Sequence, residues 1–167
     1  MTQSPAAPLF AGSRARGKLG ALLLGIIRLT GASAMAADGL TTIASAHGPA
    51  ETEQRLAAAL AQKGLTVFAR IDHAAGAAAV GMSLRPTTVL IFGAAKAGTP
   101  LMQAAQTIGI DLPLKALVWQ DAAGKTWLSH NDPRWLARRH GLDPAAAPAA
   151  EAMAAGLDAL ARAITAP

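Results

Sequence analysis

Two apolar segments near residue 120 restrict the fold more than any other feature of the sequence. Leu114–Gln120 and Lys125–His130 both have the composition of β-strands. Only Asp121–Gly124 separates them, which is the length of a hairpin loop and far too short for a helical crossover. The two segments are therefore predicted to pair antiparallel, and this pairing excludes a purely parallel sheet.

The remainder of the segment from about residue 40 to 142 alternates between strand and helix patterns. Strands are predicted over 40–46, 65–72 and 87–93, helices over 50–63, 99–106 and 132–140, and a short helix or turn over 73–82. In the second strand the alternation predicts a core face made of Leu65, Val67, Ala69 and Ile71. This order of elements predicts an α+β fold with a mixed, mainly antiparallel sheet and helices packed mostly on one face.

The first 36 residues have the pattern of a secretory signal peptide. Arg14, Arg16 and Lys18 precede the apolar run Leu19–Ile27, and a small-x-small cleavage motif follows at Ala34–Ala36. We therefore expect residues 1–36 to be a signal peptide and the mature protein to be periplasmic. Two alternatives remain open, which are an uncleaved leader that tethers the domain to a membrane and a basic tail on a cytoplasmic protein.

The net charge of +5 belongs mostly to this leader. Four of the 15 Lys and Arg residues precede Ala36, whereas every Asp and Glu follows it, so residues 37–167 carry a net charge of +1. A nearly neutral domain lacks the basic surface that nucleic-acid binding requires. The sequence thus predicts no nucleic-acid partner, and membrane contact only through an uncleaved leader.

The C-terminal part of the chain is predicted to form a separate helix. Residues 37–142 form the expected domain, residues 143–148 a Pro/Ala linker, and residues 149–167 an amphipathic helix. Met153, Leu157, Leu160 and Ile164 fall on one stripe of this helix. We expect the stripe to dock on the domain or on a partner.

Five polar side chains are the candidate ligand-binding residues. Asp72 and His73 lie where a strand ends and could support acid/base chemistry, although Asp72 also fits a helix cap. Lys96 and Thr99 surround a predicted helix start that could hold a small anionic ligand, or could be a plain cap. Lys115 interrupts an apolar strand, where it is a site lysine or a side chain reaching solvent.

Several short motifs in this order resemble the domain of unknown function 302 family. The matching segments are 69–74, 85–93, 98–104, 111–115, 131–133 and 139–140. The resemblance implies a compact α+β domain that is often paired as a dimer, and it implies no established reaction. The chain departs from the family pattern at Ala94-Ala95, where Asn-Pro is usual before the lysine, and at His130, where Tyr is usual.

No complete catalytic or metal-binding motif occurs in the sequence. Cysteine is absent, and the four histidines have no ligand spacing, so we predict no metal and no cofactor and assign no catalytic residue. The leading hypothesis is an exported, non-catalytic module that binds a small ligand or a partner and acts as a homodimer. The alternative is a small enzyme with a pocket around Asp72, His73 and Lys96.

Overall fold

The structure is a computed structural model that describes residues 37–167, so the predicted signal peptide lies outside the described residues. The strands are β1 (Leu40–Ala44), β2 (Thr66–Asp72), β3 (Thr87–Gly93), β4 (Leu114–Gln120) and β5 (Thr126–Asn131). The α-helices are α1 (Pro49–Gln62), α2 (His73–Ala79), α3 (Ala95–Ala104), α4 (Pro133–Arg139) and α5 (Ala147–Thr165). Two short 3-10 helices, η1 (Gln106–Ile110) and η2 (Pro144–Ala146), precede β4 and α5.

The strands form one sheet in the order β1-β5-β4-β3-β2, and all four pairings are antiparallel. The predicted α+β class with a mainly antiparallel sheet is therefore confirmed. The predicted hairpin between β4 and β5 is also present, with Trp119 opposite Trp127 and their rings stacked 6.0 Å apart. Asp121 fixes the connecting loop, because its carboxylate accepts hydrogen bonds from the Trp127 indole and two backbone amides. The bond from Trp127 is the main reason why the pKa of Asp121 is lowered.

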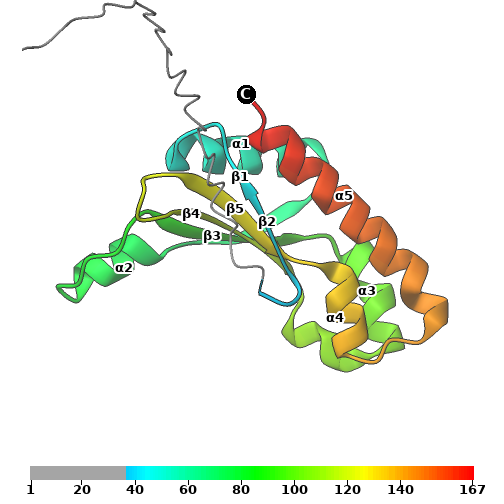
Figure 1. The fold of residues 1–167 in the computed structure, drawn as a ribbon. Helices are drawn as coiled ribbons and strands as arrows, with labels where there is room; N and C mark the ends of the chain where they lie inside the picture. The colour runs from blue at the N-terminus through cyan, green and yellow to red at the C-terminus, as the bar shows by residue number, and fades with distance from the viewer. Residues whose placement is uncertain (1–36) are drawn as a thin grey trace, which may run out of the picture. The chain divides into compact units, whose positions relative to one another are not determined.

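Helices cover one face of the sheet (Figure 1). α1 and α5 pack on this face and on each other, whereas α3 and α4 lie beside α5 near one end of the strands. α2 projects at the opposite end. Leu90, Phe92, Val118 and Leu128 point from the sheet into the main core, where they meet buried leucines of α1 and α5. The expected placement of helices mostly on one face is therefore confirmed.

The opposite face of the sheet lies away from α1 and α5. Because side chains alternate along a strand, Val89, Ile91, Leu117 and Trp119 point to this face, and each is only partly buried. Figure 1 shows none of the labelled helices packed across it. We call the side of the sheet that carries these four residues the open face.

The predicted core face of the second strand is wrong beyond Leu65, which packs against the main core. Val67 and Ile71 are 38% and 42% exposed, because β2 is an edge strand and not an inner one. A β-bulge between Val67 and Ala69 also breaks the alternation, so these two residues pair with neighbouring residues of β3 and point to opposite faces. On the helix-facing side of β2, Arg70 donates to Glu53 of α1.

The predicted helix start at Thr99 is wrong as well. α3 begins at Ala95, with Ala94 as its N-cap residue, so Thr99 and Pro100 lie inside the helix. The high helix propensity of the alanines at 94, 95 and 97 favours one additional turn before the proline. Pro100 interrupts the helical hydrogen bonds without ending the helix.

The C-terminal helix docks on the domain itself. α5 contributes Leu157, Leu160 and Ile164 to the main core, and Ala154 is fully buried. Met153 packs against a second apolar cluster around Leu101 and Leu136. The predicted apolar stripe is therefore the surface through which α5 meets the sheet and α1.

Candidate functional site

The described residues form a large apolar cavity between α3, α5 and the adjoining ends of β2, β3 and β4. Its volume is about 620 Å³, which lies within the range of small-molecule sites, about 300–1,000 Å³. Nineteen of its lining residues are apolar or glycine, and the other two are Lys63 and Lys96. The apolar lining residues are Leu65, Phe68, Phe92, Gly93, Ala94, Ala95, Ala97, Gly98, Pro100, Met102, Leu112, Pro113, Leu114, Ala149, Ala152, Met153, Gly156, Leu157 and Leu160.

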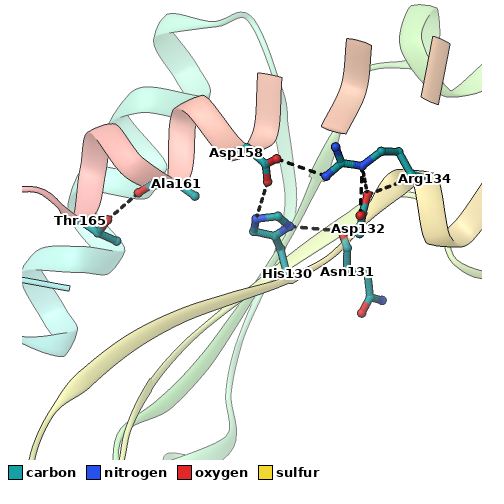
Figure 2. A network of polar contacts seen from close by, with 7 residues as sticks. All are labelled: His130, Asn131, Asp132, Arg134, Asp158, Ala161 and Thr165. Atoms are coloured by element: carbon teal, nitrogen blue, oxygen red, sulfur yellow. Dashed lines mark hydrogen bonds and ion pairs between the residues drawn. The ribbon is translucent and has the colours of Figure 1, made fainter. Parts of the chain in front are cut away.

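A polar cluster connects β5 with α4 and α5 (Figure 2). It consists of His130, Asp132, Arg134 and Asp158. His130 is 2% exposed, and its Nε2 lies 3.6 Å from Asp158 Oδ1 without a hydrogen-bond partner among the described residues. Its Nδ1 is 3.2 Å from the backbone oxygen of Asn131, which fits a bond donated by that nitrogen. Arg134 bridges the cluster, since its guanidinium bonds to both Asp132 and Asp158.

Asp132 has a second role as the N-cap of α4. Its carboxylate accepts bonds from the backbone amide and the side chain of Arg134 at 2.8 Å each. Burial acts to raise the pKa of Asp132, but these bonds and the positive charge of Arg134 outweigh it, so the pKa is lowered. Asp132 thus caps the helix that the sequence predicts over 132–140, and the carboxylate is held in its charged form.

A second histidine, His140, lies at the C-terminal end of α4. His140 Nε2 lies 2.6 Å from Asp111 Oδ2, and His140 Nδ1 lies 3.1 Å from the Thr107 hydroxyl. Arg139 approaches the same carboxylate at 3.6 Å. These contacts join the C-terminal end of α4 to η1 and to the segment before β4. The imidazole of His140 lies between the two other groups, with the Asp111 carboxylate on one ring nitrogen and the Thr107 hydroxyl on the other.

The structure separates Asp72 and His73 from Lys96. Asp72 accepts a hydrogen bond from the Ala75 amide and caps α2, while His73 is exposed at the first position of that helix. Asp72 pairs with Thr88 at the start of β3, whereas Lys96 follows the end of the same strand. A strand of seven residues spans roughly 20 Å, so these side chains do not share a pocket.

The remaining candidates lie at different places. Lys96 lines the apolar cavity, whereas Thr99 is exposed within α3, beside Met102 and Gln106. Lys115 points to the open face, opposite Ile91, and its Nζ donates to the backbone oxygens of Asp111 and Pro113. Of the five candidates, only Lys96 therefore lies at the apolar cavity.

The family model for the domain of unknown function DUF302 matches residues 41–160. This range includes β2 to β5, all but the first residue of β1, and most of α5. The chain belongs to the DUF302 family.

Two proteins of known name contain a segment that is similar to this chain. This chain is 50% identical over 119 residues to proteins named fluoride-specific ion channel FluC 1 in Brucella suis and Brucella abortus. The match covers 71% of this chain but only 47% and 44% of those proteins. The chain thus spans less than half the length of these relatives.

A solved structure has the same fold. A DUF302 protein from Bacillus stearothermophilus superposes with a TM-score of 0.70, over 78% of this chain and the whole of the other. The two sequences are 23% identical, so this comparison supports the fold of the DUF302 domain alone.

Sequence reasoning missed most of the DUF302 cavity. Its walls come from segments as far apart as Lys63 and Leu160, and their apolar residues look like ordinary core positions. The pattern that could have indicated it is the run Gly93–Gly98, which has small side chains next to a strand end and a single lysine.

In the part of the chain that the structure describes, no group of three His, Asp or Glu side chains could hold a metal ion. Nor does any helix between residues 37 and 167 have the length and hydropathy needed to cross a membrane.

Proposed function

We propose that this DUF302 domain is a non-catalytic module that binds a small apolar ligand in the cavity between α3 and α5. The observation that supports this function most directly is the cavity lining, which combines a volume of about 620 Å³ with an almost wholly apolar wall. Apolar concave sites with few polar groups are typical of small-molecule binding. The alternative, an enzyme with Asp72, His73 and Lys96 at one pocket, lacks this support because those residues lie apart.

A cavity-filling substitution tests the ligand site. Gly156 lines the cavity on α5, and a Cβ atom added at this position would meet no atom within 4 Å beyond the neighbouring backbone of its own helix. Gly156→Leu should therefore preserve the fold and occupy part of the cavity. The matched control is Gly76→Leu, because Gly76 also lies in a helix with open space around it, but outside the cavity.

The assay is the binding of the neutral fluorescent probe N-phenyl-1-naphthylamine to the full chain. We expect saturable binding that Gly156→Leu weakens at least tenfold and that Gly76→Leu leaves unchanged. Circular dichroism verifies that both variants are folded. Absence of saturable binding, or equal binding by Gly156→Leu and the unmodified chain, would contradict the proposed site.

The module is proposed to act as a homodimer that pairs through the open face. This face carries Val89, Ile91, Leu117 and Trp119, and β2 beside it exposes Ile71. A contiguous apolar sheet surface that is partly exposed fits a protein–protein contact. Light scattering on the full chain should give a dimer mass, Leu117→Lys should give a monomer, and Ile110→Lys, at an exposed apolar position outside the sheet, should leave the dimer intact. A strict monomer for the unmodified chain would refute this part.

Export to the periplasm remains part of the proposal. It is supported by the basic and apolar pattern of residues 14–36. N-terminal sequencing of the protein from its native cells should give a start near Ala37. An intact Met1 in the soluble fraction would refute export.

A second candidate function follows from the FluC relatives. Since a segment 50% identical to this chain occurs within proteins named fluoride-specific ion channels, the module could associate with such a channel. The full chain would be expressed with an affinity tag beside a FluC-type channel, and detergent-solubilised membranes would be purified on the tag. Recovery of the channel in stoichiometric amount supports this function, and its absence from the purified fraction opposes it.

A further inference from the structure

We infer that the apolar cavity takes a single-chain amphipathic anion, with the tail along α5 and the anionic head at Lys63 and Lys96. This inference rests on the proposed ligand-binding function and names the class of ligand. It depends on three properties of the cavity, which are the sign of its charges, the position of those charges and its length.

The charged groups of the cavity all have one sign. Lys63 and Lys96 line it, and no carboxylate side chain does. Neither lysine takes part in an ion pair with a described residue. Both ammonium groups are therefore available to an anion, whereas a cationic ligand would meet only repulsion.

The two lysines lie at the rim of the cavity. Both residues are exposed, Lys63 at the end of α1 and Lys96 in the first turn of α3. A lysine in such a position rests its aliphatic stem on an apolar wall and keeps its ammonium in water. An anionic head bound there stays partly hydrated, so it avoids the large desolvation free energy of a buried charge.

The remainder of the cavity suits an apolar tail. The contribution of α5 extends from Ala149 to Leu160, which is roughly 16 Å at 1.5 Å per residue. Phe68, Phe92 and Met102 add large apolar side chains to this wall, which provides no side-chain hydrogen bond to a ligand. A long wall without polar groups favours an alkyl chain over a polar or branched molecule.

Calorimetric titration of the full chain with three molecules of equal tail length tests the inference. The probes are decanoate, decanol and decyltrimethylammonium. We expect decanoate to bind about tenfold more tightly than decanol, which corresponds to two partly exposed charge contacts, and the cation to bind more weakly than decanol. Lengthening the carboxylate should raise affinity about fourfold per methylene while the tail still fits.

Substitutions of the two rim lysines test where the anionic head of the ligand binds. Lys63→Met and Lys96→Met together keep the apolar stems and remove both charges, so decanoate should then bind no better than decanol. The control is Lys125→Met, since Lys125 lies in the hairpin over the Trp127 ring and outside the cavity. Equal binding of decanoate and decanol by the unmodified chain would overturn the anion inference and leave the ligand-binding proposal standing. Failure of all three probes to bind would overturn both.

Discussion

Replacement of Asp132 tests the cluster that connects α4 to the sheet. Asp132→Ala removes the N-cap of α4 and one partner of Arg134. Loss of an Asp cap costs about 1 kcal/mol. The ion pair adds about 0.5 kcal/mol after allowance for solvent screening, because the Asp132 and Arg134 side chains are 21% and 35% exposed. The free energy of unfolding should therefore fall by about 1.5 kcal/mol at pH 7, or about 5 °C in Tm.

The pH dependence of this loss has a definite sign. The pKa of Asp132 is lower in the folded protein than in the unfolded chain. Such a group stabilises the fold above its unfolded pKa of about 3.9, and this contribution disappears as the pH falls through the folded pKa. Urea unfolding followed by circular dichroism should thus give a difference between Asp132→Ala and the unmodified chain that shrinks by about 0.5 kcal/mol, the ion-pair part, as the pH falls below the folded pKa. The neutral carboxyl still offers a capping oxygen, so the cap part of the difference remains.

Two further variants separate the cap from the charge. Asp132→Asn retains a capping oxygen and should lose only about 0.5 kcal/mol at pH 7. Asp143→Ala removes the cap of the three-residue η2, where Asp143 forms no ion pair with a described residue, and should lose about 0.5–1 kcal/mol for the cap alone. A loss for Asp132→Ala that is negligible at pH 7, or that grows as the pH falls, would refute the assigned contacts.

Three other changes test separate parts of the fold by the same unfolding assay. Leu60→Ala should lower the free energy of unfolding by about 2–5 kcal/mol, because Leu60 is fully buried. Val80→Ala should change it by less than about 0.5 kcal/mol, because Val80 is 71% exposed. Equal losses for the two variants would contradict the placement of Leu60 in the core. Pro100→Ala should stabilise the protein by about 1–3 kcal/mol, since it restores a backbone hydrogen bond inside α3. Thr99→Ala should change stability by less than about 0.5 kcal/mol. A clear loss of stability for Thr99→Ala would mean that the helix starts at Thr99. Asp158→Ala should cost about 1–3 kcal/mol, because it removes the carboxylate beside the buried His130 and one of the two carboxylates bonded to Arg134, and an unchanged stability would contradict these contacts.

Local sequence patterns predicted the elements whose geometry is decided locally. The hairpin between β4 and β5 needed only two strand-forming segments and a short loop with Asp121 and Gly124. The start of α4 followed from Asp132 and Pro133, which fit the N-cap and first position of a helix. In each case the residues that determine the structure are neighbours in sequence.

The environment of β2 could not be predicted in the same way. Whether Val67 and Ile71 are buried depends on the position of β2 at the sheet edge and on the bulge beside Ala69. Both features follow from long-range pairing with β3. An alternating pattern indicates that a strand forms, but it does not determine which neighbours cover each side.

The apolar cavity was missed for a related reason. Leu114, Leu157 and Leu160 contact the cavity and also pack in the main core, so their residue types are those of an ordinary core. A cavity arises where neighbouring elements fail to fill the space between them, and that depends on helix placement. Only Lys96, an exposed cation next to a strand end, was both a candidate from the sequence and part of this cavity.

The departure at Ala94-Ala95 connects the helix start with the character of the cavity. In the family pattern these positions usually carry Asn-Pro, and Asn suits an N-cap and Pro a first helical position. α3 still begins here, but Ala94 forms no side-chain cap bond. The sequence therefore lacks the usual capping residues at this helix start. The next residues that fit a helix start are Thr99 and Pro100, so the sequence predicts a start at Thr99. Both alanines also line the cavity, where an asparagine amide would add a polar group. Alanine at these two positions thus provides neither a side-chain cap nor a polar group on this wall, and Lys96 lies beside it as a charged group at the rim.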